Sequence, residues 1–93
     1  MPILNEFNSE RIELDSILER YYEEQFILAD GFNDAILGVD DNRMIIVYSS
    51  KKIISILMDQ DDLEFEDALD HFHYNIKGSY VGEKTPLFID DMF

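Results

Sequence analysis

The fold is decided by residues 35–48, whose sequence is AILGVDDNRMIIVY. Two apolar runs rich in β-branched residues, 35–39 and 44–48, flank a polar segment, 40–43, and this composition predicts two strands joined by a tight connection. Both runs have apolar residues at adjacent positions, so we expect both faces of the sheet to be covered or the strands to be central. Gly38 inside the first run predicts a bulge or a close approach by another element. The stretch therefore predicts a β-hairpin.

The segment before the hairpin predicts an amphipathic helix over residues 10–26. Its apolar stripe has the i, i+3, i+4, i+7 spacing and consists of Leu14, Ile17, Leu18 and Tyr21. The acidic residues off this stripe form a second, spread patch: Glu13, Glu19, Glu23 and Glu24. Ser9 or Asp15 is expected as the N-cap, and residues 1–9, which show no period, are expected to form an arm.

A second helix is expected directly after the hairpin, over residues 51–58, with Ser49 or Ser50 as its N-cap. Lys51 and Lys52 would lie in its first turn, where the helix dipole disfavours cations. A continuation of the preceding strand is therefore the competing interpretation.

Residues 65–76 predict a third helix, ended by Gly78, and residues 87–89 predict a short strand added to the hairpin. The resulting order is α-β-β-α-α-β. It predicts an α+β fold, in which residues 1–93 form a single small domain. A three-stranded, mostly antiparallel sheet would pack with about three helices.

Composition narrows the classes of function. The chain has 21 Asp and Glu against 7 Lys and Arg, a formal net charge of −14. Such a charge repels phosphate backbones and anionic lipid, which argues against direct binding of nucleic acid or a membrane and favours a basic protein surface as partner. Because the chain has no Cys, it has no disulfide, thiolate zinc site or thiol nucleophile. With no secretory signal pattern at residue 1, a cytoplasmic protein is expected. No cofactor is expected.

The densest charged feature is residues 59–70, with seven carboxylates in twelve residues and no Lys or Arg. A calcium loop beginning at Asp59 would have Leu63 and Glu64 at positions that require a ligand and a glycine, so the calcium interpretation fails. Two interpretations remain: a solvated helix start, or a face whose carboxylates imitate a phosphate track and bind a partner. The candidate partner-binding residues are Asp59, Asp61, Asp62, Glu64, Glu66, Asp67 and Asp70.

A second candidate contact is the loop before the hairpin, in which Asp30 and Asp34 flank Phe32. In one interpretation Phe32 inserts into a partner while the two carboxylates meet a basic rim. In the other, Phe32 turns inward to cap the core and the carboxylates make local turn hydrogen bonds.

An alternative function uses Glu66, Asp70 and His73, which would project within about 60° of one another on an α-helix. Two carboxylates and an imidazole suit a metal-assisted enzyme or a small-ligand binder, and the Asp30/Asp34 loop could serve the same purpose. The structural explanation is that His73 lies in the last turn, where the dipole favours its charge. No catalytic or metal-binding residue is assigned. A further alternative is a homodimeric structural protein whose acidic surface serves solubility.

Three stretches together resemble a family of short uncharacterised proteins of bacteriophages and bacteria. They are ADGFNDAILGV at 29–39, ILM at 56–58 with FEDA at 65–68, and NIKGSYVGEKTPLF at 75–88. The family pattern usually has Asp at position 33, an acidic residue at 73 and an apolar residue at 77, where this chain has Asn33, His73 and Lys77. The resemblance implies a small accessory protein, located in the host cytoplasm if it is encoded by a phage.

Charge and resemblance together lead to one main expectation. We expect a small acidic phage-type accessory protein, not an enzyme, that binds a basic surface of a nucleic-acid-handling protein and blocks it. Mimicry of nucleic acid would make it a counter-defence or host-takeover inhibitor.

Overall fold

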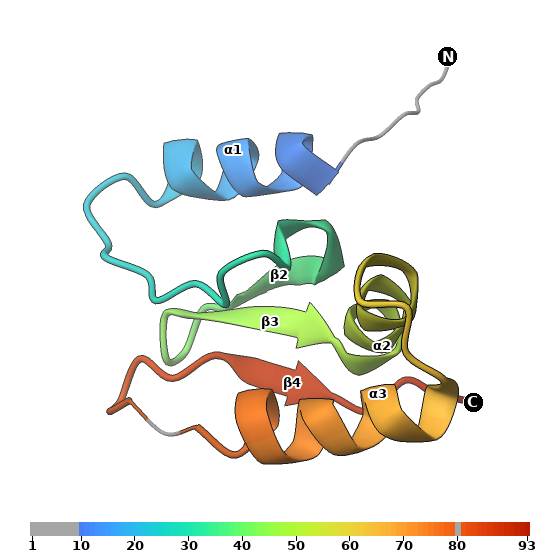
Figure 1. Cartoon of the computed structure of the whole chain (residues 1–93). Helices are drawn as coiled ribbons and strands as arrows, with labels where there is room; N and C mark the ends of the chain where they lie inside the picture. Colours follow the sequence, from blue (N-terminus) through green and yellow to red (C-terminus); the bar gives the residue numbers. More distant parts are fainter. Residues whose placement is uncertain (1–9, 80) are drawn as a thin grey trace.

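The computed structural model describes residues 10–79 and 81–93. In chain order the elements are α1 (Glu10–Arg20), the 3-10 turn η1 (Asn33–Ala35), β2 (Ile36–Asp40), β3 (Ile45–Ser49), α2 (Ser50–Gln60), α3 (Phe65–His71), the π-helix η2 (Phe72–Lys77) and β4 (Leu87–Ile89) (Figure 1). The α+β class and the order α-β-β-α-α-β are confirmed. The arm expected over residues 1–9 and the Ser9 cap lie outside the described residues.

The three strands form one mixed sheet in the order β2-β3-β4. β2 and β3 pair antiparallel, and their register shifts between Ile36 and Gly38, which confirms the bulge expected at the glycine. β4 pairs parallel to β3, with Tyr48 opposite Phe88, so the sheet is mixed and not mostly antiparallel as expected. Parallel neighbours need a long crossover, and here α2 and α3 supply it.

The hairpin connection is held by its own backbone and by one aspartate. The N–H of Met44 donates to the carbonyl of Asp40 over 2.7 Å, and the N–H of Asn42 donates to the Asp40 carboxylate over 3.1 Å. Met44 has a φ of 55°, in the left-handed region that a tight reversal requires. The expected tight connection is therefore present, and each strand begins and ends one residue later than predicted.

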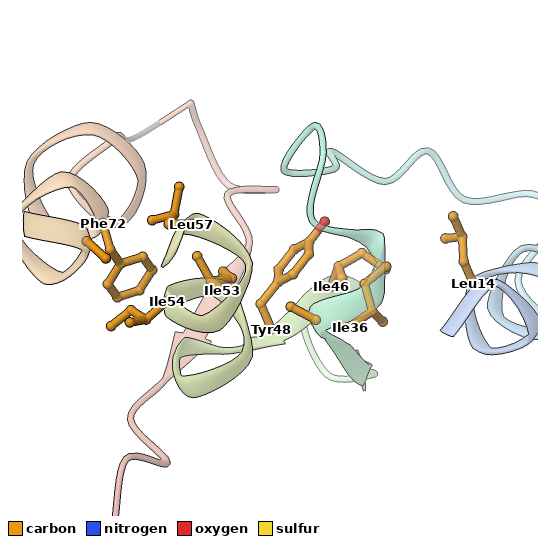
Figure 2. Packing of buried hydrophobic residues seen from close by; sticks show 10 residues of the cluster. Leu14, Ile36, Ile46, Tyr48, Ile53, Ile54, Leu57 and Phe72 are labelled. Carbon is orange, nitrogen blue, oxygen red and sulfur yellow. The ribbon is translucent and has the colours of Figure 1, made fainter. Parts of the chain in front are cut away.

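One face of the sheet forms the main core. Ile36, Tyr48 and Phe88 are register partners on this face, and the rings of Tyr48 and Phe88 stack with centroids 5.4 Å apart. Phe72 of η2 meets Phe88 edge-on, with centroids 5.7 Å apart. In Figure 2, Ile36, Ile46 and Tyr48 lie between the α2 side chains and Phe72 on one side and Leu14 of α1 on the other. Burial of these large side chains supplies most of the driving force for folding.

The two faces of the sheet differ in burial. β3 is the central strand, as one of the two interpretations expected, and four of its five residues are buried. On the strands that flank it, Leu37, Leu87 and Ile89 are exposed. The expectation that both faces of the sheet are fully covered is therefore wrong. The apolar character of the hairpin reflects the central position of β3.

α1 is shorter than expected. It ends at Arg20 instead of continuing to Phe26, and Asp15 lies inside the helix instead of capping it. After a turn, the chain runs back toward the hairpin, where the N–H of Ala29 donates to the Tyr48 hydroxyl over 2.7 Å. Tyr21 meets Phe26 edge-on, with centroids 6.2 Å apart. The Lys84 ammonium lies 5.9 Å from the centroid of the Phe26 ring, and this contact and the Tyr48 hydrogen bond override a helical periodicity that continues past Arg20.

The start of α2 confirms the cap expected from Ser49. The Ser49 hydroxyl accepts a hydrogen bond from the Lys52 N–H over 3.0 Å, and it donates to the Asp91 carboxylate over 2.5 Å. Asp91 also accepts from the Lys51 N–H over 2.9 Å. A carboxylate from the chain segment after β4 thus offsets the two lysines that oppose a helix here.

The third helix begins at Phe65, as predicted, but changes geometry at Phe72. From Phe72 to Lys77 it widens into a π-helix, and Gly78 ends it. A Cβ at residue 78 would lie only 3.1 Å from the carbonyl oxygen of His73, so a glycine suits the wide last turn. Within residues 10–79 and 81–93, no helix has both the length and the apolar character needed to cross a membrane.

Candidate partner-binding surface

The seven carboxylates expected to bind a partner lie around the connection between α2 and α3, and all are exposed. One belongs to the end of α2, three to the connection and three to α3. We call this surface the acidic ridge; its members are Asp59, Asp61, Asp62, Glu64, Glu66, Asp67 and Asp70. Figure 1 shows the two helices meeting at one end of the molecule, so the ridge follows that junction.

No cation pairs with the acidic ridge in the described part of the chain. The ion pairs among the described residues lie outside the ridge and join Arg43 to Asp40 over 3.9 Å and Lys84 to Glu24 over 3.2 Å. The lysines of the helices that carry the ridge lie at the far ends of those helices: Lys51, Lys52 and Lys77. The ridge is therefore a region of uncompensated negative charge.

The charged residues at both ends of α2 interact unfavourably with the helix dipole. The C-terminal end of a helix favours cations, and here it has three acids: Asp59, Asp61 and Asp62. The first turn has two lysines and no acid. On α3 the arrangement is favourable, because Glu66 and Asp67 lie in the first turn. Helix stability thus explains Glu66 and Asp67 and leaves the acids at the end of α2 unexplained.

The backbone of the ridge is strained at one acid. Asp62 has a φ of 55°, a left-handed conformation that costs a residue with a side chain on the order of 1 kcal/mol. Its neighbour Asp61 ends α2 with an N–H that donates to the Leu57 carbonyl over 3.0 Å. A glycine would fit position 62 without strain, so an aspartate here adds charge at the expense of stability.

The loop of Asp30, Phe32 and Asp34 does not continue the acidic ridge. Phe32 is half-buried and packs against the core, while both carboxylates are exposed. The Phe32 N–H donates to the Ala29 carbonyl over 3.1 Å, and its carbonyl accepts from the Ala35 N–H over 2.9 Å. Phe32 therefore has the inward position of the second interpretation. The carboxylates of Asp30 and Asp34 remain exposed and available to a partner.

Glu66, Asp70 and His73 do not converge on a metal site. Within residues 10–79 and 81–93, no three His, Asp or Glu side chains are grouped so that they could hold a metal ion. His73 follows the change to π-helical geometry at Phe72, and its ring lies beside the Phe72 ring, with centroids 5.4 Å apart. The α-helical phase that would align His73 with the two carboxylates does not extend to it.

A cavity that the sequence analysis missed lies at the other end of the third helix. It measures about 230 Å³ and is enclosed by the loop before β2, the end of η2 and the segment that leads into β4. Its lining residues are Ile27, Leu28, Ala29, Asp30, Phe32, Asn75, Ile76, Ser79, Val81, Pro86 and Phe88. Most of them fall in the stretches 29–39 and 75–88, which carry the resemblance to the phage and bacterial family. The two stretches together were the sequence signal that could have indicated a shared site.

Two groups with shifted pKa values lie away from the acidic ridge. Partial burial disfavours the charge of Asp91, but the hydrogen bonds from Ser49 and Lys51 and the Lys51 charge outweigh it and lower the pKa of this carboxyl. Burial raises the pKa of the Tyr48 hydroxyl, and the hydrogen bond from Ala29 offsets only part of that rise. Both groups support the fold.

The second acidic patch is only partly available for a partner. Glu19 and Glu23 are exposed, but Glu24 pairs with Lys84, which also donates to the Met44 carbonyl over 3.0 Å. Glu24 therefore joins the chain after α1 to the hairpin and to the segment before β4.

Comparison of the chain with models of known protein families, with curated proteins and with solved structures gave no match.

Proposed function

We propose that this chain is a non-enzymatic interaction protein whose acidic ridge binds a basic surface of a nucleic-acid-handling protein and blocks it. The observation that carries the proposal is the placement of Asp59, Asp61 and Asp62 at the C-terminal end of α2. Acids there weaken the helix through its dipole, and the left-handed Asp62 adds strain. Local rules of stability tend to be broken where function requires it.

The spacing of the ridge supports a partner that normally binds phosphates. Glu66 and Asp70 are four residues apart on α3, which brings their side chains about 5–6 Å from one another on one helix face. A row of negative charges at this spacing attracts a surface built to bind a nucleic-acid backbone. The net charge of −14 adds long-range steering toward such a surface.

The resemblance to short phage and bacterial proteins supports the setting of this function. A small phage-encoded protein that occupies the nucleic-acid site of a host nuclease, polymerase or repair factor would act in counter-defence or host takeover. The inhibition would need no chemistry by the chain itself, because occupation of the basic surface excludes the natural ligand.

Matched charge reversals test the proposal. Changing Glu66, Asp67 and Asp70 to Lys raises the net charge by 2 per residue, from −14 to −8. The same change at Asp15, Asp41 and Glu83, which are exposed and outside both acidic patches, gives an equal net charge. Bacterial lysate passed over the wild type and both variants, followed by mass spectrometry, identifies the bound proteins.

The proposal expects a nucleic-acid-handling protein that is retained by the wild type and the control variant and lost from the ridge variant. Its affinity should fall steeply between 50 and 500 mM salt, since screening weakens charge attraction, and added DNA or RNA should compete with the chain. Equal retention by all three proteins, or affinity that does not change with salt, would contradict the ridge as the binding surface.

A further inference from the structure

The cavity beside the loop of residues 27–32 has walls suited to an apolar group and a charged edge. Phe32 and Phe88 supply aromatic surface, Ile76 supplies aliphatic surface, and these three side chains are half-buried. In the described part of the lining, Asp30 is the single charged side chain, and it is exposed. The site therefore combines an apolar interior with a negative rim.

The size of the cavity selects the kind of group that it accepts. Pockets for drug-sized ligands and cofactors usually measure about 300–1,000 Å³. A cavity of about 230 Å³ is below that range and suits one large side chain. Leu28 and Val81 line the cavity and remain 39% and 55% exposed, so a body larger than the inserted group is needed to cover them.

The position of the cavity relates it to the acidic ridge. The ridge surrounds the connection between α2 and α3, and the cavity lies at the end of η2. α3 and η2 form one continuous helical segment (Figure 1). Asp70 and Ile76 are six residues apart in this continuous helical segment, so the two sites belong to different turns of it. A peptide with an apolar side chain in the cavity has its flanking residues beside the negative rim at Asp30.

We infer that the cavity is an anchor site for one bulky apolar side chain of the basic partner, presented by a segment in which Lys or Arg residues flank it. This inference rests on the proposed function and adds a second contact to it. Interfaces concentrate binding energy in a few large side chains that fill a pocket and are surrounded by a polar rim. Here the rim is Asp30, and the flanking cations of the peptide complement it.

A pair of short peptides tests the anchor. The probe is acetyl-Lys-Arg-Phe-Arg-Lys-amide, and its control has Ala in place of Phe. Titration of the isotope-labelled protein, followed by amide chemical shifts, should show the probe shifting residues around the cavity, such as Ala29, Ile76 and Val81. The Ala peptide should bind about tenfold more weakly, the loss typical of removing an interface anchor.

Variants at the exposed edge of the cavity separate its shape from its charge. Val81→Lys adds bulk and a repelling cation, whereas Val81→Glu adds similar bulk and an attracting anion. The Lys variant should weaken the Phe peptide at least about fivefold relative to the Glu variant, because like charges at an interface are unfavourable. Tyr74→Ala is the matched control, since Tyr74 is exposed on η2 and does not line the cavity; it should leave binding unchanged.

Each outcome distinguishes this inference from the proposed function. Equal binding of both peptides, with shifts confined to residues 59–70, would overturn the anchor site and leave the ridge supported. Absence of binding by either peptide would contradict both. If 2-phenylethylammonium alone saturates the cavity as tightly as the Phe peptide does, the site is a small-ligand pocket and the peptide assignment is wrong.

Discussion

Ser49 and Ser50 are adjacent, and each is only 1% exposed, yet their hydroxyls have different surroundings. Ser49 caps α2 and donates to Asp91, so both roles of its oxygen are used. The Ser50 oxygen is buried without a hydrogen-bond partner among the described residues. A buried hydroxyl that loses its water contacts and gains no partner lowers the free energy of unfolding.

The two serines should therefore respond in opposite directions to the same change. Ser50→Ala is expected to raise the free energy of unfolding by about 1 kcal/mol, because an unpaired buried polar group is removed. Ser49→Ala is expected to lower it by about 1–2 kcal/mol through loss of the N-cap. Urea unfolding of both variants measures the difference, and a destabilising Ser50→Ala would indicate that its hydroxyl has a partner.

Asp91 gives a stability effect that depends on pH. Its folded-state pKa is lowered, so its charge contributes stability that is present above the unfolded value near 3.8 and is lost as the pH falls through the folded-state value. Wild type should exceed Asp91→Asn in stability at neutral pH, and this difference should shrink below pH 3.8. Denaturant titrations at several pH values measure it. A difference that is constant down to pH 2 would show that the charge of Asp91 makes no contribution.

At the scale of the elements, the two helices of the acidic ridge use their charges in opposite ways. Glu66 and Asp67 lie at the N-terminus of α3 and stabilise it, while the acids of α2 lie at a C-terminus and destabilise it. Removal of an acid from the end of α2 is therefore expected to raise stability and weaken partner binding, whereas removal of Glu66 or Asp67 is expected to lower both. This difference allows the two contributions to be measured separately.

Single reversals in the two helices test that difference. At low salt, Asp59→Lys should raise the free energy of unfolding by about 0.3–1 kcal/mol, and Glu66→Lys should lower it by a similar amount. Both should weaken binding of a basic partner, because both remove ridge charge. Unfolding and binding measured at the same salt concentration give the comparison. If the tighter-folding Asp59→Lys also binds as well as the wild type, the α2 acids do not belong to the binding surface.

Tyr48 joins the central strand to the loop that walls the cavity. Tyr48→Phe removes the hydroxyl that accepts from the Ala29 N–H and leaves that N–H unpaired. A loss of about 1–2 kcal/mol in the free energy of unfolding is expected, together with faster amide exchange at Ala29. Denaturation and hydrogen exchange measure the two effects, and unchanged exchange at Ala29 would show that the loop is held by other contacts.

The elements were predictable to the extent that local patterns determine them. The hairpin, the Ser49 cap and the strand at 87–89 follow from apolar runs, a polar connection and capping chemistry. The end of α1 at Arg20 depends on contacts of Phe26 with Lys84 and of Ala29 with Tyr48, which periodicity does not contain. The ridge was predictable because its seven acids fall within twelve consecutive positions, 59–70. The cavity was not, since residues about 50 positions apart enclose it.

At the scale of the whole molecule, charge and exposed apolar surface act against each other. Leu37, Leu87 and Ile89 remain exposed on the outer strands, and such surface favours association. A net charge of −14 on 93 residues opposes it by repulsion between copies. The balance predicts a monomer at low ionic strength.

Sedimentation at two salt concentrations tests this balance. The chain should sediment as a monomer of 10.9 kDa at low salt. Screening in high salt should allow at most weak association, because repulsion decreases with ionic strength. A stable dimer at low salt would favour the homodimeric alternative.

The parallel pairing of β4 has a consequence for the order of folding. The hairpin closes within 14 residues, but Tyr48 and Phe88 meet only across 40 positions, and such distant pairings form slowly. During that interval the second edge of β3 presents unpaired backbone groups to other chains, the arrangement from which aggregation starts. The abundant carboxylates keep these partly folded chains apart, so the same charge that we propose attracts a partner also protects the chain while it folds.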